Sequence, residues 1–178
     1  QWPEMKKHYP KAIYAGRLSP EKGIAPLLAA ISLLPELKFA IVGDGPMAKQ
    51  VEEFSQSHAN LTFFPKRNHA EALALIQQSR IGILPSLCNE ILSLFALEVF
   101  SQGKRCVVSN QESMLWFSGG AFPGILAESG NPAAIAQSIR SALELPEISA
   151  AEKSALQKKL APERFCVELK GVVSETKL

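Results

Sequence analysis

The chain has 178 residues, of which 47% are hydrophobic, and 19 Lys and Arg against 17 Asp and Glu give a formal net charge of +2. This suits one domain with its own core, and the small charge argues against nucleic acid or an anionic membrane as a partner. Cys88, Cys106 and Cys166 lack the spacing of a disulfide framework or zinc site. No apolar run reaches the roughly 18 residues of a membrane span. We therefore expect a cytoplasmic protein, with peripheral membrane contact at most.

Short apolar segments alternate with helical patterns along the chain, which is typical of a parallel sheet covered by helices. We expect strands over residues 11–15, 37–42, 61–64, 81–84, 105–109 and 124–126. Helices are expected over residues 24–33, 47–57, 70–78, 93–102 and 132–143. The strand segments show no polar alternation, which indicates that both faces of the sheet are buried. The pattern predicts an α/β fold: a Rossmann-like parallel sheet of about six strands with helices on both faces.

Three regions differ in character along the chain. Residues 1–10 begin with Gln rather than Met, and we interpret them as a linker from a missing N-terminal domain. Residues 11–145 form the predicted domain, and residues 146–178 are charged and predicted to contain further helices, over 149–160 and 163–169. The segment 111–122 is irregular and receives no assignment.

In an open parallel sheet, ligands bind outside the carboxyl ends of the strands. The loops that follow the first four expected strands should therefore meet in one crevice; they cover residues 16–23, 43–46, 65–68 and 86–93. The first loop carries Arg17 and Lys22 and leads into a helix, whose N-terminal N–H groups favour anions. Such a pair can neutralise a diphosphate. The alternative is that both are solvated surface cations.

The segment Gly43-Asp44-Gly45-Pro46-Met47-Ala48 fits the dinucleotide-binding pattern G-x-G-x-x-A. That pattern requires an acidic residue about 20 positions later to hold a ribose. Here the next strand ends in Pro65-Lys66-Arg67, without a carboxylate. We therefore interpret the glycines as a tight turn that gives a ligand room, and Pro46 as the start of the next helix. A nicotinamide or flavin enzyme is disfavoured.

Glu90 and Glu98 flank the start of an apolar helix, and a buried charge needs a polar partner. The helix begins near Ser93, where free N–H groups of Ser93, Leu94 and Phe95 can hold a phosphate. Glu98 lies about one turn further, roughly 6 Å along the axis, which suits the hydroxyls of a ribose. Glu90 would then face a donor sugar. The alternative is that Glu98 belongs to a polar network in the core and Glu90 is exposed to solvent.

Other catalytic groups are less favoured. His58 and His69 stand at the ends of expected helices in polar surroundings, so we expect surface residues rather than catalysts. Cys88 lies near the crevice, but no histidine neighbours it in the sequence to activate the thiol. No Ser-His-Asp order and no metal-ligand motif is present. A mechanism without a metal therefore fits best.

Four motifs occur in order and with suitable spacing. They are Gly16-Arg17-Leu18-Ser19-Pro20-Glu21-Lys22-Gly23, Ile41-Val42-Gly43-Asp44-Gly45-Pro46, Leu84-Pro85-Ser86, and Glu90 to Glu98 followed by Gly103-Lys104. Over residues 11–145 the chain resembles the C-terminal, nucleotide-sugar-binding domain of GT-B-fold retaining glycosyltransferases with the paired-glutamate (E-x7-E) motif. This large family includes sucrose synthase-like and bacterial lipopolysaccharide and mannosyl transferases. The resemblance implies a hexosyltransferase of polysaccharide or lipopolysaccharide biosynthesis, at work in the cytoplasm or at the inner face of the membrane.

The resemblance also implies roles for residues. Arg17 and Lys22 would hold the donor diphosphate, Glu98 the ribose and Glu90 the sugar; Glu90, Arg17 and Lys22 would be the catalytic residues. The loop 65–67 would meet the base, largely through its backbone. The complete implied set of nucleotide-sugar contacts is Arg17, Lys22, Gly43, Pro65, Lys66, Glu90, Ser93, Leu94 and Glu98. No cofactor and no metal is implied, because cations and a helix N-terminus stabilise the charge on the leaving diphosphate.

The chain departs from this family's pattern after the first glutamate, where Gly-Phe-Gly is common and Ile91-Leu92-Ser93 stands here. Glycine allows close backbone approach, so larger side chains would narrow or reshape the donor pocket. Arg105 is a smaller departure, where proline is common after Gly-Lys. The acceptor, a glycan or lipid-linked molecule, would bind through the missing N-terminal domain, so the fragment alone is expected to be inactive. The alternatives are a non-catalytic GT-B-like interaction module and a nucleotide-sugar epimerase.

Overall fold

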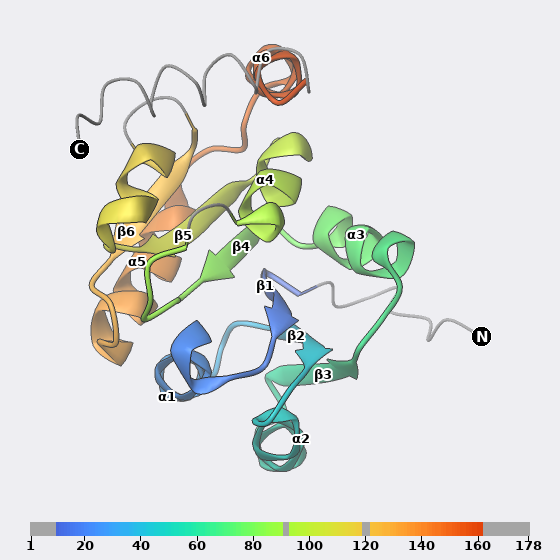
Figure 1. Cartoon of the computed structure of the whole chain (residues 1–178), viewed down its shortest axis with the longest axis vertical. Coiled ribbons are helices and arrows are strands. Elements are labelled where there is room, and N and C mark those ends of the chain that lie inside the picture. Colours follow the sequence, from blue (N-terminus) through green and yellow to red (C-terminus); the bar gives the residue numbers. More distant parts are fainter. Residues whose placement is uncertain (1–9, 91–92, 119–121, 162–178) are drawn as a thin grey trace.

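A computed structural model of the chain describes residues 10–90, 93–118 and 122–161 (Figure 1). Its strands form one parallel sheet in the order β3-β2-β1-β4-β5-β6. The strands are β1 (Ala12–Arg17), β2 (Phe39–Asp44), β3 (Leu61–Pro65), β4 (Ile81–Leu84), β5 (Arg105–Ser109) and β6 (Gly124–Ala127). The chain moves outward from β1 to β3 and then returns to place β4 on the other side of β1. The strand order therefore reverses between β1 and β4, where open sheets of this class bind ligands.

Helices cover both faces of the sheet. They are α1 (Ile24–Ser32), α2 (Ala48–Ser57), α3 (His69–Gln78), α4 (Leu94–Ser101), α5 (Pro132–Glu144) and α6 (Ala150–Lys159), with 3₁₀ helices η1 (Pro20–Lys22) and η2 (Glu112–Phe117). Buried side chains of α1, α2 and α5 form one core cluster with the sheet, and those of α3, α4, α6 and η2 form a second cluster on the other face. Adjacent residues of β1 belong to different clusters: Tyr14 is part of the first and Ile13 of the second. The doubly covered parallel sheet predicted from the sequence is thus confirmed.

Element boundaries agree with expectation to within about two residues. The main difference is that β1 and β2 run on to Arg17 and Asp44, which pair across the sheet. Arg17 is therefore a strand residue and not a loop residue. Pro46 does not start a helix as expected, because α2 begins at Ala48 after Met47. The irregular segment contains η2, while the expected helix over 163–169 and the linker lie outside the described residues.

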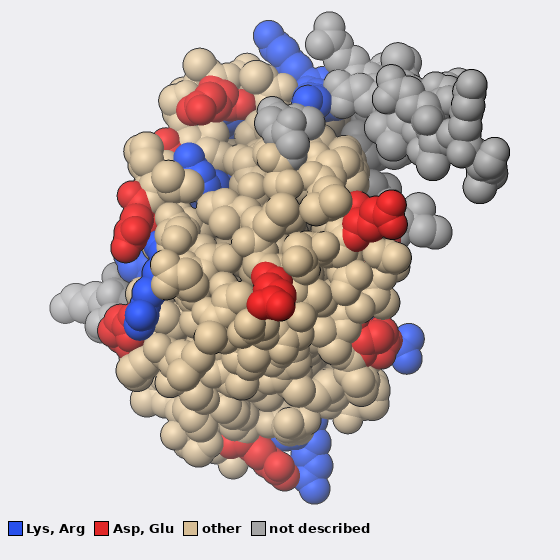
Figure 2. Space-filling model, turned by 90° about the vertical axis from the view of Figure 1, so that its left-hand side faces the viewer, with Lys and Arg blue, Asp and Glu red and all other residues tan. Residues whose placement is uncertain are grey.

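Charged side chains are sparse on the face that carries α5 and β6. Figure 2 shows its centre with few Lys, Arg, Asp or Glu side chains, most of which lie around the rim. The part of this face that the structure describes therefore carries no dense basic patch, in line with the small net charge. Within the described ranges, no helix has both the length and the apolar character needed to cross a bilayer.

Candidate functional site

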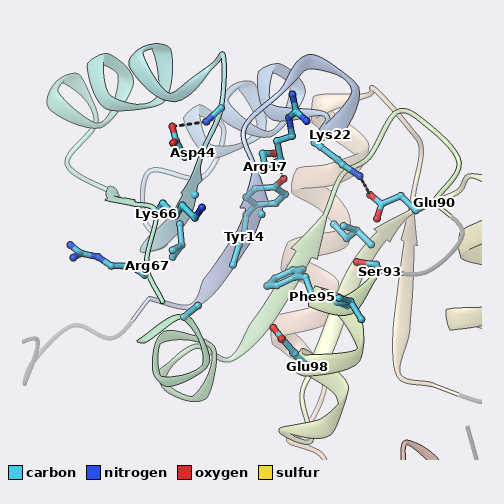
Figure 3. Close-up of a pocket in the computed structure, with 18 residues that line it drawn as sticks. Tyr14, Arg17, Lys22, Asp44, Lys66, Arg67, Glu90, Ser93, Phe95 and Glu98 are labelled. Carbon is cyan, nitrogen blue, oxygen red and sulfur yellow. Dashed lines mark hydrogen bonds and ion pairs between the residues drawn. The ribbon is translucent and has the colours of Figure 1, made fainter. Parts of the chain in front are cut away.

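A cavity of about 770 Å³ opens at the carboxyl edge of the sheet, beside the point where strand order reverses (Figure 3). Its walls come from the ends of β1, β2 and β4, the loop after β3, and the first turns of α4. Eight of the expected contact residues line it: Arg17, Lys22, Gly43, Lys66, Glu90, Ser93, Leu94 and Glu98. Pro65, the last residue of β3, is absent from the lining, although its pairing partner Gly43 belongs to it. Segments distant in the sequence thus meet in one crevice, as predicted.

Two aromatic side chains line the cavity: Tyr14, which sequence reasoning missed, and Phe95, of which it named only the backbone N–H. Tyr14 is 2% exposed, and its ring centroid lies 6.1 Å from that of Phe95. Its hydroxyl donates a hydrogen bond to the backbone oxygen of Arg17, at 2.7 Å. Burial, with a smaller contribution from the Glu90 carboxylate, raises the pKa of Tyr14, so the phenol stays a neutral donor. Tyr14 therefore anchors the strand end that presents Arg17 to the cavity.

The glycines of the Gly43-Asp44-Gly45 turn are required by the protein's own backbone. A Cβ on Gly43 would lie 1.9 Å from the backbone oxygen of Gly16, and one on Gly45 would lie 2.4 Å from that of Leu18. The backbone N–H of Leu18 donates a hydrogen bond to the backbone oxygen of Asp44 at 2.8 Å, and this bond joins the two turns. Both glycines also line the cavity, so the interpretation that they give a ligand room stays a prediction. They bring the β2 turn against the end of β1.

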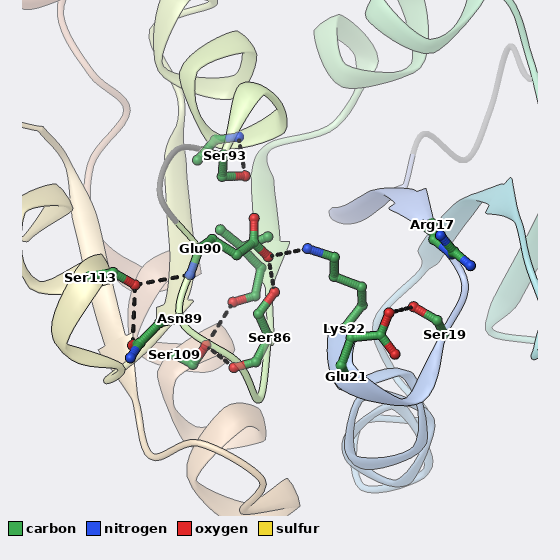
Figure 4. A network of polar contacts seen from close by, with 12 residues as sticks. Arg17, Ser19, Glu21, Lys22, Ser86, Asn89, Glu90, Ser93, Ser109 and Ser113 are labelled. Carbon is green, nitrogen blue, oxygen red and sulfur yellow. Dashed lines mark hydrogen bonds and ion pairs between the residues drawn. The ribbon is translucent and has the colours of Figure 1, made fainter.

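Glu90 is paired within the protein. Its Oε1 lies 3.0 Å from Lys22 Nζ, with the two side chains 11% and 27% exposed. The Ser86 hydroxyl donates to the same oxygen, and the backbone N–H of Glu90 donates to Ser113 Oγ at 3.0 Å (Figure 4). The alternative of a solvent-exposed Glu90 is therefore wrong, and so is the alternative of a solvated Lys22 without a partner. Ser113 comes from η2, in the segment that the sequence left unassigned.

Arg17 differs from Lys22 in having no ion-pair partner within the part of the chain that the structure describes. Among residues 10–90, 93–118 and 122–161, its guanidinium takes part in no ion pair or side-chain hydrogen bond. Lys66 and Arg67 are exposed cations on the rim formed by the loop after β3. These side chains leave positive charge on the cavity wall that an anionic ligand can neutralise.

The N-terminus of α4 points into the cavity. Ser93 caps the helix, and its side chain accepts a hydrogen bond from Ala96 N at 3.3 Å. The N–H groups of Leu94 and Phe95 lie in the first turn, where a helix has no internal acceptor for them. Ser93 is thus the cap, and its own N–H, like those of Leu94 and Phe95, has no acceptor within the helix, as expected. The remaining donors and the helix dipole favour an anion here.

Glu98 is paired with a histidine that sequence reasoning set aside. His69 Nε2 lies 2.8 Å from Glu98 Oε1, and the two side chains are 73% and 31% exposed. His69 is a surface residue, as expected, but it is also the polar partner that Glu98 was predicted to need. The pair lies at the rim and not in the core, so the alternative of a core network is wrong. The two residues are 29 positions apart, and no local pattern links them.

The remaining candidates lie away from the cavity. Lys104 is at the opposite edge of the sheet, where its ammonium donates to the backbone oxygen of Ser79 and burial lowers its pKa. Cys106 is buried in the core, which raises its pKa and keeps the thiol inert. Within the described residues, no group of three His, Cys, Asp or Glu side chains is placed to hold a metal ion.

Comparison with known proteins gives one family. Residues 3–159 match the model of the family described as glycosyl transferases group 1. A glycogen synthase of Mycobacterium tuberculosis is 28% identical over 155 residues, which cover 83% of this chain and 37% of the relative. The chain therefore spans well under half the length of that curated relative.

Solved structures share the fold. One is Alr3699/HepE from Anabaena in complex with UDP and glucose, with a TM-score of 0.70 and 21% identity, over 94% of this chain and 48% of the other. Another is a sucrose-phosphate synthase from Thermosynechococcus elongatus, with a TM-score of 0.72 and 20% identity, over 93% of this chain and 45% of the other. The chain corresponds to about half of each of these proteins.

Proposed function

Because the chain belongs to the family of group 1 glycosyl transferases, we propose that it is the half of a retaining glycosyltransferase that binds the donor, a nucleoside diphosphate sugar. The observation that carries the proposal is the composition of one cavity. Cations, the free N-terminus of α4 and the Glu98 carboxylate all line it. A nucleoside diphosphate offers matching chemistry, with negative charge at one end and donating ribose hydroxyls at the other.

The diphosphate would lie between β1 and α4. Arg17 stands on one side without an ion-pair partner in the described part of the chain, and the N–H groups of Leu94 and Phe95 stand on the other. Negative charge develops on the diphosphate as the bond to the sugar breaks. Donors already aimed at that charge lower the barrier, and loss of one typically costs about 100- to 1,000-fold in rate.

The nucleoside would extend toward α3. Glu98 lies about one turn beyond the tip of α4, roughly 6 Å along the axis, within reach of ribose hydroxyls on a bound diphosphate. Lys66 and Arg67 border the same end of the cavity, where the base would lie. A structural neighbour was solved with UDP and glucose, which makes UDP the first nucleotide to test.

The sugar would lie on the other side of the α4 tip, near Glu90. Lys22 holds that carboxylate and also faces the cavity, so it can serve the sugar-phosphate junction. We propose that a glycan or lipid-linked acceptor reaches this point from a second domain, since the structural neighbours are about twice as long. The enzyme would then act in bacterial polysaccharide or lipopolysaccharide assembly in the cytoplasm.

Calorimetry with UDP, GDP and ADP tests the donor-binding function. At least one of the three should bind with a Kd below about 1 mM. Arg17→Gln should weaken that binding, because it removes a cation that lines the cavity and has no ion-pair partner among the described residues. Lys49→Gln is the matched control, since Lys49 is exposed on α2 and does not line the cavity. A folded chain that binds none of the three would refute the proposal and favour the interaction module.

A further inference from the structure

The contact between His69 and Glu98 joins a residue outside the cavity to one that lines it. Glu98 belongs to the cavity wall, whereas His69 does not. A carboxylate can only accept hydrogen bonds, so the Nε2 atom at 2.8 Å must carry the hydrogen and donate it to Glu98. His69 therefore contacts Glu98 from α3 without being part of the cavity wall itself.

His69 is itself well held. It is the first residue of α3, and Asn68 caps this helix by accepting from the backbone N–H of Glu71 at 3.0 Å. The Glu71 carboxylate accepts from the backbone N–H of Asn68 in return, at 3.2 Å. Leu75 and Ile76 anchor the other end of α3 in the core cluster that also contains α4. The imidazole thus starts from a fixed backbone, although the ring itself is exposed.

We propose that His69 is a positioning residue that fixes the Glu98 carboxylate for the ribose of the donor. The proposal rests on the proposed function. An ionised carboxylate has about four acceptor positions. His69 uses one, and positions remain for two ribose hydroxyls.

The advantage is entropic. Glu98 is 31% exposed, so without His69 its side chain would have to be immobilised when the nucleotide binds. Immobilising such a side chain weakens binding by about 3- to 10-fold. His69 removes this cost in advance. Because a neutral imidazole can donate through Nε2, the contact does not require a charged ring.

Calorimetry on the 178-residue chain can separate positioning from general structure. The probes are whichever of UDP, GDP and ADP binds the wild type most tightly, and its 2′,3′-dideoxy counterpart. His69→Ala should weaken binding of the ribonucleotide about 3- to 10-fold and leave binding of the dideoxy compound within about twofold. His69→Gln should restore part of the loss, because its amide can donate to Glu98. In a Glu98→Ala background, His69→Ala should have no further effect.

Controls distinguish the outcomes. His58→Gln changes the C-cap of α2, which does not line the cavity, and should alter neither affinity. Thermal unfolding of the His69 variants should stay close to wild type because the ring is largely exposed. Suppose that the wild type binds a ribonucleotide, but His69→Ala weakens the binding of both probes equally or of neither. The inference is then overturned and the proposed function stands. Absence of binding by the wild type would overturn both.

Discussion

Lys22 Nζ lies 3.0 Å from Glu90 Oε1, so the cation expected to hold a phosphate and the carboxylate expected to hold a sugar are joined across the crevice. The pair is mostly shielded from solvent, and Ser86 donates to the same Glu90 oxygen. Each of the two charged groups thus has a partner of opposite charge without any ligand. A donor would enter a site whose charged groups are already oriented.

Breaking this pair should cost stability. Lys22→Gln leaves Glu90 shielded without its cation, so we expect the free energy of unfolding to fall by about 1 to 3 kcal/mol, less than for a fully buried pair because Lys22 is partly exposed. Urea denaturation measures the change. The double variant Lys22→Gln/Glu90→Gln should recover part of the loss, whereas losses that simply add would show that the two side chains are not coupled.

Glu98 should matter for nucleosides and not for phosphate. Glu98→Ala should weaken nucleoside diphosphate binding about tenfold or more, because ribose hydroxyls lose a charged acceptor, while pyrophosphate binding changes less than about twofold. Calorimetry with both probes measures the difference. Glu53→Ala, on the exposed face of α2, is the control. An equal loss for the two probes would contradict the ribose role.

Gly43 should be intolerant of any side chain. Gly43→Ala would place a Cβ 1.9 Å from the backbone oxygen of Gly16, so β1 or β2 must shift, at a cost of about 3 kcal/mol or more. Gly130→Ala is the comparison, because its Cβ would meet only Leu87 at 3.5 Å and the cost of about 1 kcal/mol is that of its left-handed backbone. Chemical denaturation of both variants tests the order. If Gly43→Ala and Gly130→Ala lost similar stability, the close approach to Gly16 would not explain the effect of Gly43→Ala.

Tyr14 should make the protein sensitive to alkali. Burial raises its pKa above the ordinary value of 10.0, so above about pH 10 the unfolded chain loses the phenolic proton while the folded chain keeps it. Fewer protons on the unfolded state mean that stability falls as pH rises, by about 1.4 kcal/mol per pH unit for this group. Tyr14→Phe should lower stability at neutral pH through loss of the bond to Arg17, yet flatten the alkaline decline.

Denaturation of the wild type and Tyr14→Phe at several pH values between about 8 and 11 makes that comparison. Cys106, whose pKa burial also raises, is present in both proteins, so the difference in slope isolates Tyr14. Parallel declines in the two proteins would assign the alkaline sensitivity to other groups.

The sequence by itself determined the fold class and the place of the site. Apolar strands without polar alternation predict a sheet buried on both faces, and parallel strands bring their carboxyl ends to one edge. The apolar pattern is local, so it predicted the bounds of the elements to within about two residues. The geometry of a parallel sheet predicted one crevice, and eight of the expected contact residues line it. Membership of the group 1 glycosyl transferases also confirms the resemblance to the C-terminal domain of GT-B-fold retaining enzymes.

Only the tertiary structure decided which side chains meet. Glu98 pairs with His69, 29 residues away, because α3 and α4 pack side by side on one face of the sheet. Glu90 meets Lys22 of η1 and Ser113 of η2 because these two segments, distant from each other in the sequence, both pack beside it. Gly43 is constrained by the backbone oxygen of Gly16, a contact between two segments that no local pattern predicts. Local patterns describe one segment at a time, whereas these contacts depend on how separate segments pack.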